Sequence, residues 1–253
     1  MKIRVLISFL ALTAGAIFSA PAADLATPFD AANKFYAEGK YAAAATVYEQ
    51  AIQQAQTAGV VSPVLYFNDG NAEFKLGHLG LAIVAYRHAA LLTPRDSEVL
   101  GNLEFVRNQV QGATVHPSHW QNGVGSLTLN EGTGLTAGAF WLAFILLTIR
   151  QIRPALAPRL RGPTLALIGI TILAGAVLVM QAVSHFYGQT AVVIDANAVA
   201  RSGPFLEAQN AFAVHDGAEL SVLDRHDDWL QVSDGTGRIG WLPGHELAVL
   251  PGA

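Results

Sequence analysis

Apolar residues follow several distinct patterns along this chain. Residues 1–22 combine a basic start with an apolar run, which is typical of a secretory signal peptide. Residues 26–112 show helical periodicity, and the uncharged apolar stretches 132–149 and 163–183 each approach the length of a membrane span. From 189 to 250 the pattern changes to short alternating runs separated by turn residues, which indicates β-strands. The sequence therefore predicts a multidomain membrane protein with one helical and one β domain.

The leader ends in Ala20-Pro21-Ala22, whose small residues suit cleavage before Ala23. An uncleaved N-terminal anchor is the alternative, but the apolar run is short for a span. A cleaved leader would place the domain that follows it outside the cytoplasm.

The two apolar stretches are joined by a basic connector, residues 150–162. It contains Arg150, Arg153, Arg159 and Arg161 and no acidic residue. Basic connectors stay in the cytoplasm, so we expect two spans of a bacterial inner membrane with both flanking domains in the periplasm. A buried helix in a soluble core is the alternative for each stretch. Two adjacent stretches without charge argue against it.

The helical region contains an internal repeat. Residues 35–51 recur as 74–89 at an offset of 38 residues, which aligns Tyr48 with Tyr86 and a glycine and two alanines of each copy. The order of Tyr66, Gly70, Ala82, Tyr86 and Pro94 resembles the tetratricopeptide repeat (TPR), an all-α fold of stacked helix pairs. A further stretch, residues 96–110, predicts a single capping helix with Leu100, Leu103 and Val106 on its buried face.

The TPR resemblance implies a concave groove that binds peptides or partner helices. The positions that line it in that family are here Phe29, Asn33, Tyr36, Phe67, Asn71 and Phe74. Lys75 lies beside them, and Asn102 of the capping helix joins them. An asparagine in the groove would fix the backbone of an extended peptide. The alternative is that the aromatic residues only pack the helices together. A clamp for C-terminal carboxylates is not expected, because Phe29 stands where that clamp needs a lysine.

The C-terminal segment predicts five short strands, and hence a small all-β barrel. They are residues 192–194, 198–201, 219–223, 229–232 and 238–242. Its landmarks resemble a bacterial SH3 domain over 189–250: Arg201-Ser-Gly-Pro204, Asp216-Gly217, Asp227-Asp-Trp229 and Gly240-Trp241. The resemblance implies a protein or cell-wall ligand, for which Trp229 and Trp241 are candidate platform residues. The alternative is that both tryptophans belong to the core.

Composition and charge narrow the function. The chain has no cysteine and a formal net charge of −4, which excludes disulfides and argues against a nucleic-acid-binding face. We found no motif for a catalytic centre, metal site or cofactor. His116 and His119 lie in a polar, loop-forming stretch with no further ligand near them. Residues 113–131 read as a flexible linker on which the helical domain pivots. We therefore expect a protein that is not an enzyme.

The order of parts is similar to that of the E-type proteins of the Bacteroides aerotolerance operons, with residues 70–77 and 102–107 carrying the closest likeness. This resemblance implies MoxR-type ATPases and von Willebrand A-domain membrane proteins as partners, in a complex for stress or oxygen tolerance. We expect a scaffold that touches membrane lipid and gathers membrane or periplasmic proteins, without nucleic acid or cofactor. The alternative is a sensor that binds peptidoglycan through the barrel.

Overall fold

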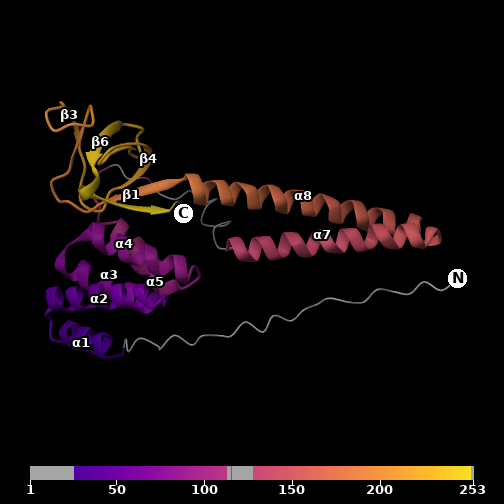
Figure 1. Cartoon of the computed structure of the whole chain (residues 1–253), viewed down its shortest axis with the longest axis horizontal. Helices are drawn as coiled ribbons and strands as arrows, with labels where there is room; N and C mark the ends of the chain where they lie inside the picture. The colour runs from indigo at the N-terminus through magenta and orange to yellow at the C-terminus, as the bar shows by residue number, and fades with distance from the viewer. Residues whose placement is uncertain (1–25, 113–114, 116–127, 252–253) are drawn as a thin grey trace.

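The computed structural model of the chain describes residues 26–112, 115 and 128–251. The predicted leader, residues 1–22, lies outside the described residues, as do His116 and His119 of the linker. The described chain forms a stack of helices, a seven-stranded antiparallel sheet, and a long helical hairpin that projects away from both (Figure 1). These parts match the helical, β and apolar segments that the hydrophobic pattern predicts.

The N-terminal stack consists of helices joined by short turns, each packed against the next. Their bounds are α1 Ala26–Ala37, α2 Tyr41–Thr57, α3 Pro63–Leu76, α4 Leu79–Leu92 and α5 Ser97–Arg107. Gly70 sets the approach of α3 and α4, because a Cβ there would lie 2.9 Å from the ring of Tyr86. A side chain at this position would therefore push the two helices apart.

The same tertiary contacts recur along the stack at the repeat offset seen in the sequence. The hydroxyl of Tyr48 donates to Asn33 Oδ1 at 2.6 Å, and that of Tyr86 donates to Asn71 Oδ1 at 2.7 Å. Each tyrosine ring also meets a phenylalanine of the helix before it, with centroids 6.4 and 5.8 Å apart. The internal repeat is therefore a repeat of structure as well as of sequence.

The capping helix α5 exposes one residue that the sequence placed in its buried face. Val99, Leu103 and Val106 are buried, whereas Leu100 is 41% exposed. Both sets have helical spacing, so periodicity over so short a helix does not separate them. The side chain of Asp96 caps α5 by accepting from the backbone N–H groups of Glu98 and Val99.

The hairpin consists of α7 (Leu129–Ile152) and α8 (Ala157–Tyr187), separated by the short 3₁₀ turn Pro154–Leu156. Both helices are long and apolar enough to cross a membrane, by length and composition. They reach beyond the predicted spans, so the basic connector is mostly helical. Arg150 lies in α7, and Arg159 and Arg161 lie in the first turns of α8. The two helices extend into the connector from either side, since arginine and alanine are good helix formers, and the chain reverses at Arg153 and the turn Pro154–Leu156.

The C-terminal sheet has seven strands where the sequence predicts five. The strands are β1 Gln189–Val193, β2 Val199–Arg201, β3 Asn210–Ala213, β4 Glu219–His226, β5 Trp229–Ser233, β6 Ile239–Pro243 and β7 Leu247–Pro251. Their spatial order is β3-β2-β6-β5-β4-β1-β7, with every adjacent pair antiparallel. The unpredicted strands β3 and β7 are the two edges, and β3 lacks the buried alternation that marks an inner strand. A short 3₁₀ turn, Gly244–Glu246, precedes β7.

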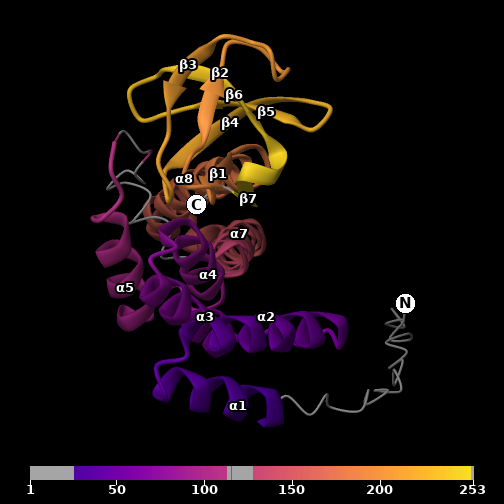
Figure 2. The same ribbon diagram turned by 90° about the vertical axis from the view of Figure 1, so that its left-hand side faces the viewer.

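The barrel packs against α4 and α5 through a shared apolar core. One buried cluster draws on both parts: Ala82, Ile83 and Tyr86 from α4, Leu103 and Val106 from α5, Val192 from β1 and Leu250 from β7. Figures 1 and 2 both place the barrel at the α4–α5 end of the stack, with α1 farthest from it. The barrel thus covers the apolar face that α5 leaves open, as a capping element does in a helical-repeat protein.

A buried ion network lies in the same interface. Arg107 donates from Nε and Nη2 to the two carboxylate oxygens of Glu219, at 2.9 and 3.0 Å. Arg87 Nη1 lies 4.0 Å from the same carboxylate. Nearby, the backbone N–H of Gly80 donates to Asp216 Oδ1 at 3.1 Å. Burial raises the pKa of Asp216, and hydrogen bonds from the backbone of Gly80 and its neighbours partly offset that rise.

This interface differs from the pivoting arrangement that the linker composition suggests. Val115, the one described residue between 113 and 127, donates its N–H to the carbonyl oxygen of Glu219 at 2.8 Å. A buried apolar core and a bidentate ion pair both require a fixed orientation. The helical stack and the barrel therefore form one unit, called here the headpiece.

Helix α3 also carries a carboxyl group in an unfavourable environment. Burial raises the pKa of Asp69 to about 7, and the negative charges of Glu73 on α3 and Glu49 on α2 add to the rise. The folded headpiece therefore holds a proton that the unfolded chain releases near the ordinary aspartate pKa. The contribution of Asp69 to the stability of the headpiece should therefore fall as the pH rises from about 4 to about 7.

We predict that Gly80→Ala separates the barrel from the helical stack. A Cβ on Gly80 would collide with the backbone carbonyl oxygen of Val193 and with Asp216 Oδ1, and the backbone cannot yield cheaply. Hydrogen exchange should become faster for α4 residues 79–83 and for the 214–219 segment. Gly101→Ala in α5 is the matched control, because a Cβ there meets nothing within 4 Å. It should stabilise the helix by about 0.5–1 kcal/mol. Unchanged exchange in Gly80→Ala would show that the interface is not close-packed.

We predict that Asp69→Asn stabilises the helical stack at pH 8 but not at pH 4. The native carboxyl is ionised at pH 8 at an unfavourable site, and at pH 4 it is neutral like the amide. The gain at pH 8 should reach a few kcal/mol at most, at about 1.4 kcal/mol per pKa unit. Thermal unfolding of the detergent-solubilised chain, followed by circular dichroism, measures it. Asp30→Asn removes an exposed carboxylate of α1 and is the control. An equal gain at both pH values would contradict the assignment.

Candidate binding surfaces on the helical stack and the barrel

The predicted groove asparagines are already engaged inside the helical stack. Asn33 accepts from Tyr48, and also from the side-chain amide of Asn68 at 3.3 Å. Asn71 accepts from Tyr86 and from Asn102 Nδ2 at 3.1 Å. These contacts use the carbonyl oxygens of Asn33 and Asn71. A bound peptide would therefore meet their NH₂ groups, which suits its backbone carbonyls.

The predicted groove aromatics divide into two kinds. Phe29 and Phe67 are partly buried in the core cluster of the stack, so their main role is to pack helices together. Tyr36 of α1 meets the ring of Tyr41 edge-on, with centroids 5.3 Å apart. Phe74 is also partly buried, against the core shared with the barrel, but in addition its ring meets that of Phe105 of α5 at 5.6 Å, and Phe105 is 59% exposed.

Phe105 is a surface residue that sequence reasoning missed. It lies three residues after Asn102 on α5, so the two are neighbours on one side of that helix. With Asn71, Phe74 and the exposed Lys75 of α3 they form a patch of aromatic, amide and cationic groups, called here the α3–α5 patch. The helical spacing from Asn102 was the signal that could have found Phe105.

The barrel presents the two predicted tryptophans on its outer face. Their sequence neighbours Leu230 and Leu242 are buried in the barrel core, while Trp229 and Trp241 alternate with them and stay partly exposed. Neither tryptophan belongs to the buried core cluster of the barrel. The ring of His226 lies 6.5 Å from that of Trp241. Both tryptophans are therefore in reach of a ligand.

Cross-strand pairing places Trp241 in a row of varied chemistry. Arg201 of β2 pairs with Trp241 of β6, which pairs with Gln231 of β5, which pairs with Asp224 of β4. Residues paired in this way point to the same face of the sheet. Across the sheet from β2 to β4, the row therefore presents a cation, an aromatic surface, an amide and a carboxylate in that order. Such a mixture suits a polar ligand with an apolar portion, such as a peptide or glycopeptide.

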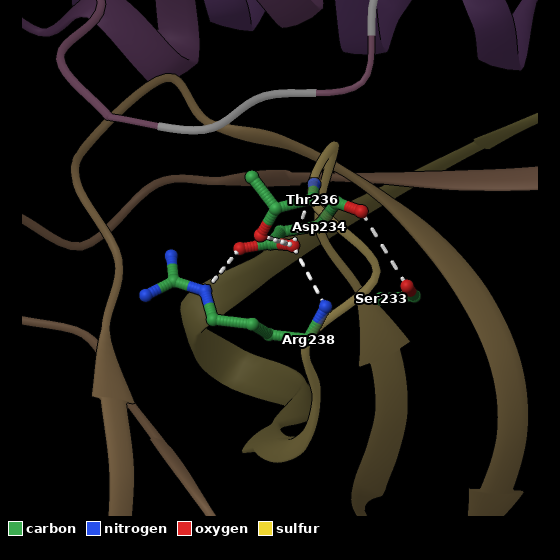
Figure 3. A network of polar contacts seen from close by, with 4 residues as sticks. All are labelled: Ser233, Asp234, Thr236 and Arg238. Atoms are coloured by element: carbon green, nitrogen blue, oxygen red, sulfur yellow. Dashed lines mark hydrogen bonds and ion pairs between the residues drawn. The ribbon is translucent and has the colours of Figure 1, made fainter.

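Two polar networks hold the loops around this row. Arg201 Nη1 donates to the carbonyl oxygens of Leu206 and Ala208, at 2.6 and 3.2 Å, and so fixes the β2–β3 loop. In the β5–β6 turn, the buried Asp234 carboxylate accepts from Thr236 and from the backbone and side chain of Arg238, at 2.7 to 3.0 Å (Figure 3).

Although burial alone would raise it, these hydrogen bonds hold the pKa of Asp234 at about 2. The carboxylate thus stays ionised, and the turn keeps its shape, throughout the physiological pH range. The guanidinium of Arg238 also lies over the ring of Phe212 of β3, with its carbon 4.5 Å from the ring centroid. The strands that carry Trp229 and Trp241 are therefore firmly braced.

Comparison with known proteins supports the assignment of the barrel. The chain resembles the uncharacterized protein YgiM of Escherichia coli strain K12, with 36% identity over 91 residues. The YgiM proteins of E. coli O157:H7 and Shigella flexneri match equally well. The match covers 35% of this chain and 43% of the relative, so the chain spans less than half the length of the curated relatives it matches. The family model for the bacterial SH3 domain matches residues 195–248, and we conclude that the barrel is a bacterial SH3 domain.

Proposed function

We propose that this chain is a membrane-anchored scaffold without catalytic activity, which presents a TPR-like module and an SH3 domain as one headpiece. The observation that carries the proposal is the buried docking of the barrel on α4 and α5 through the Arg107–Glu219 ion pair. Docking places the α3–α5 patch and the Trp241 row on one rigid body. A rigid body with two binding surfaces can hold two partners in a defined relative position.

The hairpin supplies the anchor in this proposal. α7 and α8 would span a bacterial inner membrane, with the arginine-rich turn in the cytoplasm and the headpiece in the periplasm. Only Gly188 separates α8 from β1, so the barrel would sit directly on the membrane surface. With the whole headpiece on one side, the protein would gather partners there and transmit little across the membrane.

The partners proposed for the α3–α5 patch are membrane or periplasmic proteins. The likeness to the aerotolerance E-type proteins suggests von Willebrand A-domain proteins and MoxR-associated proteins, in a stress-related complex. An extended peptide or a partner helix would place an apolar side chain against Phe74 and Phe105. Its backbone carbonyls would meet the amides of Asn71 and Asn102.

A second function is favoured by the Trp241 row. Bacterial SH3 domains bind proteins or cell-wall peptides, and a row of arginine, tryptophan, glutamine and aspartate suits the charged, amide-rich stem peptide of peptidoglycan. In this alternative the chain is a cell-wall sensor that binds through the barrel. The two functions use different surfaces of the headpiece, so they can be tested separately.

We predict the membrane topology from fusions to alkaline phosphatase, which is active only in the periplasm. Fusions after Gly112 and Leu250 should be active, and one after Arg153, in the turn between α7 and α8, should be inactive. The physical reason is the cost of moving the four arginines near this turn across the membrane. Immunoblotting of each fusion controls for expression. An active fusion after Arg153 would contradict the proposed orientation.

We predict that a photo-crosslinking amino acid at Phe105 captures a discrete protein partner in native membranes. The same probe at Glu104, the exposed neighbour on α5, is the matched control and should capture little. Adding Asn71→Ala and Phe74→Ala should abolish the Phe105 product. A probe at Trp241, with Leu223 of β4 as its control, tests the second function. Mass spectrometry identifies what each probe captures. Muropeptides attached at Trp241 together with no protein at Phe105 would contradict the scaffold and support the cell-wall sensor.

A further inference from the structure

One end of the helical stack exposes a group of leucines. Leu91 and Leu92 end α4 and are 47% and 39% exposed, and Leu100 in the first half of α5 is 41% exposed. They flank the turn between the two helices, which contains Arg95. We call these three residues the leucine patch. The opposite ends of α4 and α5 contact the barrel, so the patch lies at the end of the headpiece away from that interface.

The turn beside this patch is held against the start of the hairpin. Arg95 donates from Nη1 and Nη2 to the two carboxylate oxygens of Glu131, at 3.1 and 2.8 Å. Glu131 lies in the first turn of α7, where it also caps the helix together with Thr128. The uncharged stretch of the hairpin begins at the next residue, Gly132.

We propose that the leucine patch contacts lipid and inserts into the interfacial layer of the bilayer that the hairpin spans. This rests on the proposed membrane insertion of α7 and α8. If Gly132 marks the entry of α7 into the hydrocarbon, Glu131 and the paired Arg95 lie at headgroup level. Apolar side chains of interfacial helices enter about 5–10 Å into the boundary between headgroups and acyl chains, and in this proposal the leucine patch beside Arg95 enters the same layer.

The chemistry of the patch favours lipid over a soluble partner. The Arg95–Glu131 pair holds the turn beside the patch to the start of the apolar helix α7, so the same lipid environment can accommodate both. The cation beside it, Arg95, is paired with Glu131, and the exposed acids Asp96 and Glu98 are the other charges of this turn. Attraction to anionic headgroups therefore contributes little. Contact should depend on burial of the leucines and be indifferent to lipid charge.

The absence of cysteine from the chain allows single labelling sites. Leu92→Cys and Leu100→Cys, each carrying a fluorophore, would be reconstituted as full-length chains in vesicles of phosphatidylethanolamine and phosphatidylglycerol. Some lipids would carry a nitroxide quencher at the headgroup or high on the acyl chain. Ile145→Cys in α7 is the positive control for insertion. Leu206→Cys, in a β2–β3 loop that lies away from the hairpin in Figure 1, is the matched control for an exposed leucine.

We expect nitroxide lipids to quench the labels at Leu92 and Leu100 several-fold more strongly than the label at Leu206. The same result is expected in vesicles of phosphatidylcholine alone. Quenching at Ile145 with none at Leu92 and Leu100 would overturn the lipid contact and leave the anchor intact. Loss of quenching in phosphatidylcholine would overturn its apolar basis. No quenching at Ile145 would instead refute the membrane anchor. Circular dichroism checks that each variant keeps its helices, since all four side chains are exposed or partly exposed.

Discussion

The carboxylate of Glu219 is 3% exposed, and it meets Arg107 and Arg87 from two different helices. A buried carboxylate without partners would cost several kcal/mol, and removing one partner of a buried pair typically costs about 3–5 kcal/mol. The ion pair therefore permits only one docked orientation of the barrel on the stack. Burial also lowers the pKa of Arg87, and Glu219 partly offsets this. The shared apolar core supplies most of the free energy that holds the barrel on the stack, and the ion network fixes the orientation in which it docks.

The start of α7 and the end of α8 are both tied closely to this headpiece, which restricts how the hairpin can move relative to it. Gly188 alone connects α8 to β1, and Arg95 holds the start of α7 to the turn between α4 and α5. Two connections thus orient the headpiece on the hairpin: the covalent one from α8 to the barrel, and the ion pair between Arg95 and Glu131. The proposed scaffold would benefit from this arrangement, because binding surfaces that are already oriented lose less entropy when they meet their partners.

Sequence reasoning was most successful where a pattern was long or locally complete. The repeat offset emerged from side-chain identities alone, and the structure shows the same hydrogen bonds at that offset. The inner strands of the barrel were found from their alternation. Edge strand β3 was missed because its pattern of buried and exposed residues is irregular. On the buried face of α5, Leu100 was predicted in place of Val99, because the helix is too short for periodicity to decide between them. The helical spacing of Phe105 from Asn102 was a local signal, but its contact with Phe74 joins two helices and was visible only in the structure.

The sequence by itself determined the order of the parts, the two apolar helices, the repeat and the SH3 domain. Those features depend on local periodicity and composition, which each segment carries independently of the others. Only the tertiary structure decided that the stack and the barrel form one headpiece. The interacting residues Arg107 and Glu219 lie far apart in the chain, and nothing near either one indicates its partner. A linker composition that suggests freedom says nothing about contacts between the domains it joins, because docking depends on surfaces that only folding creates.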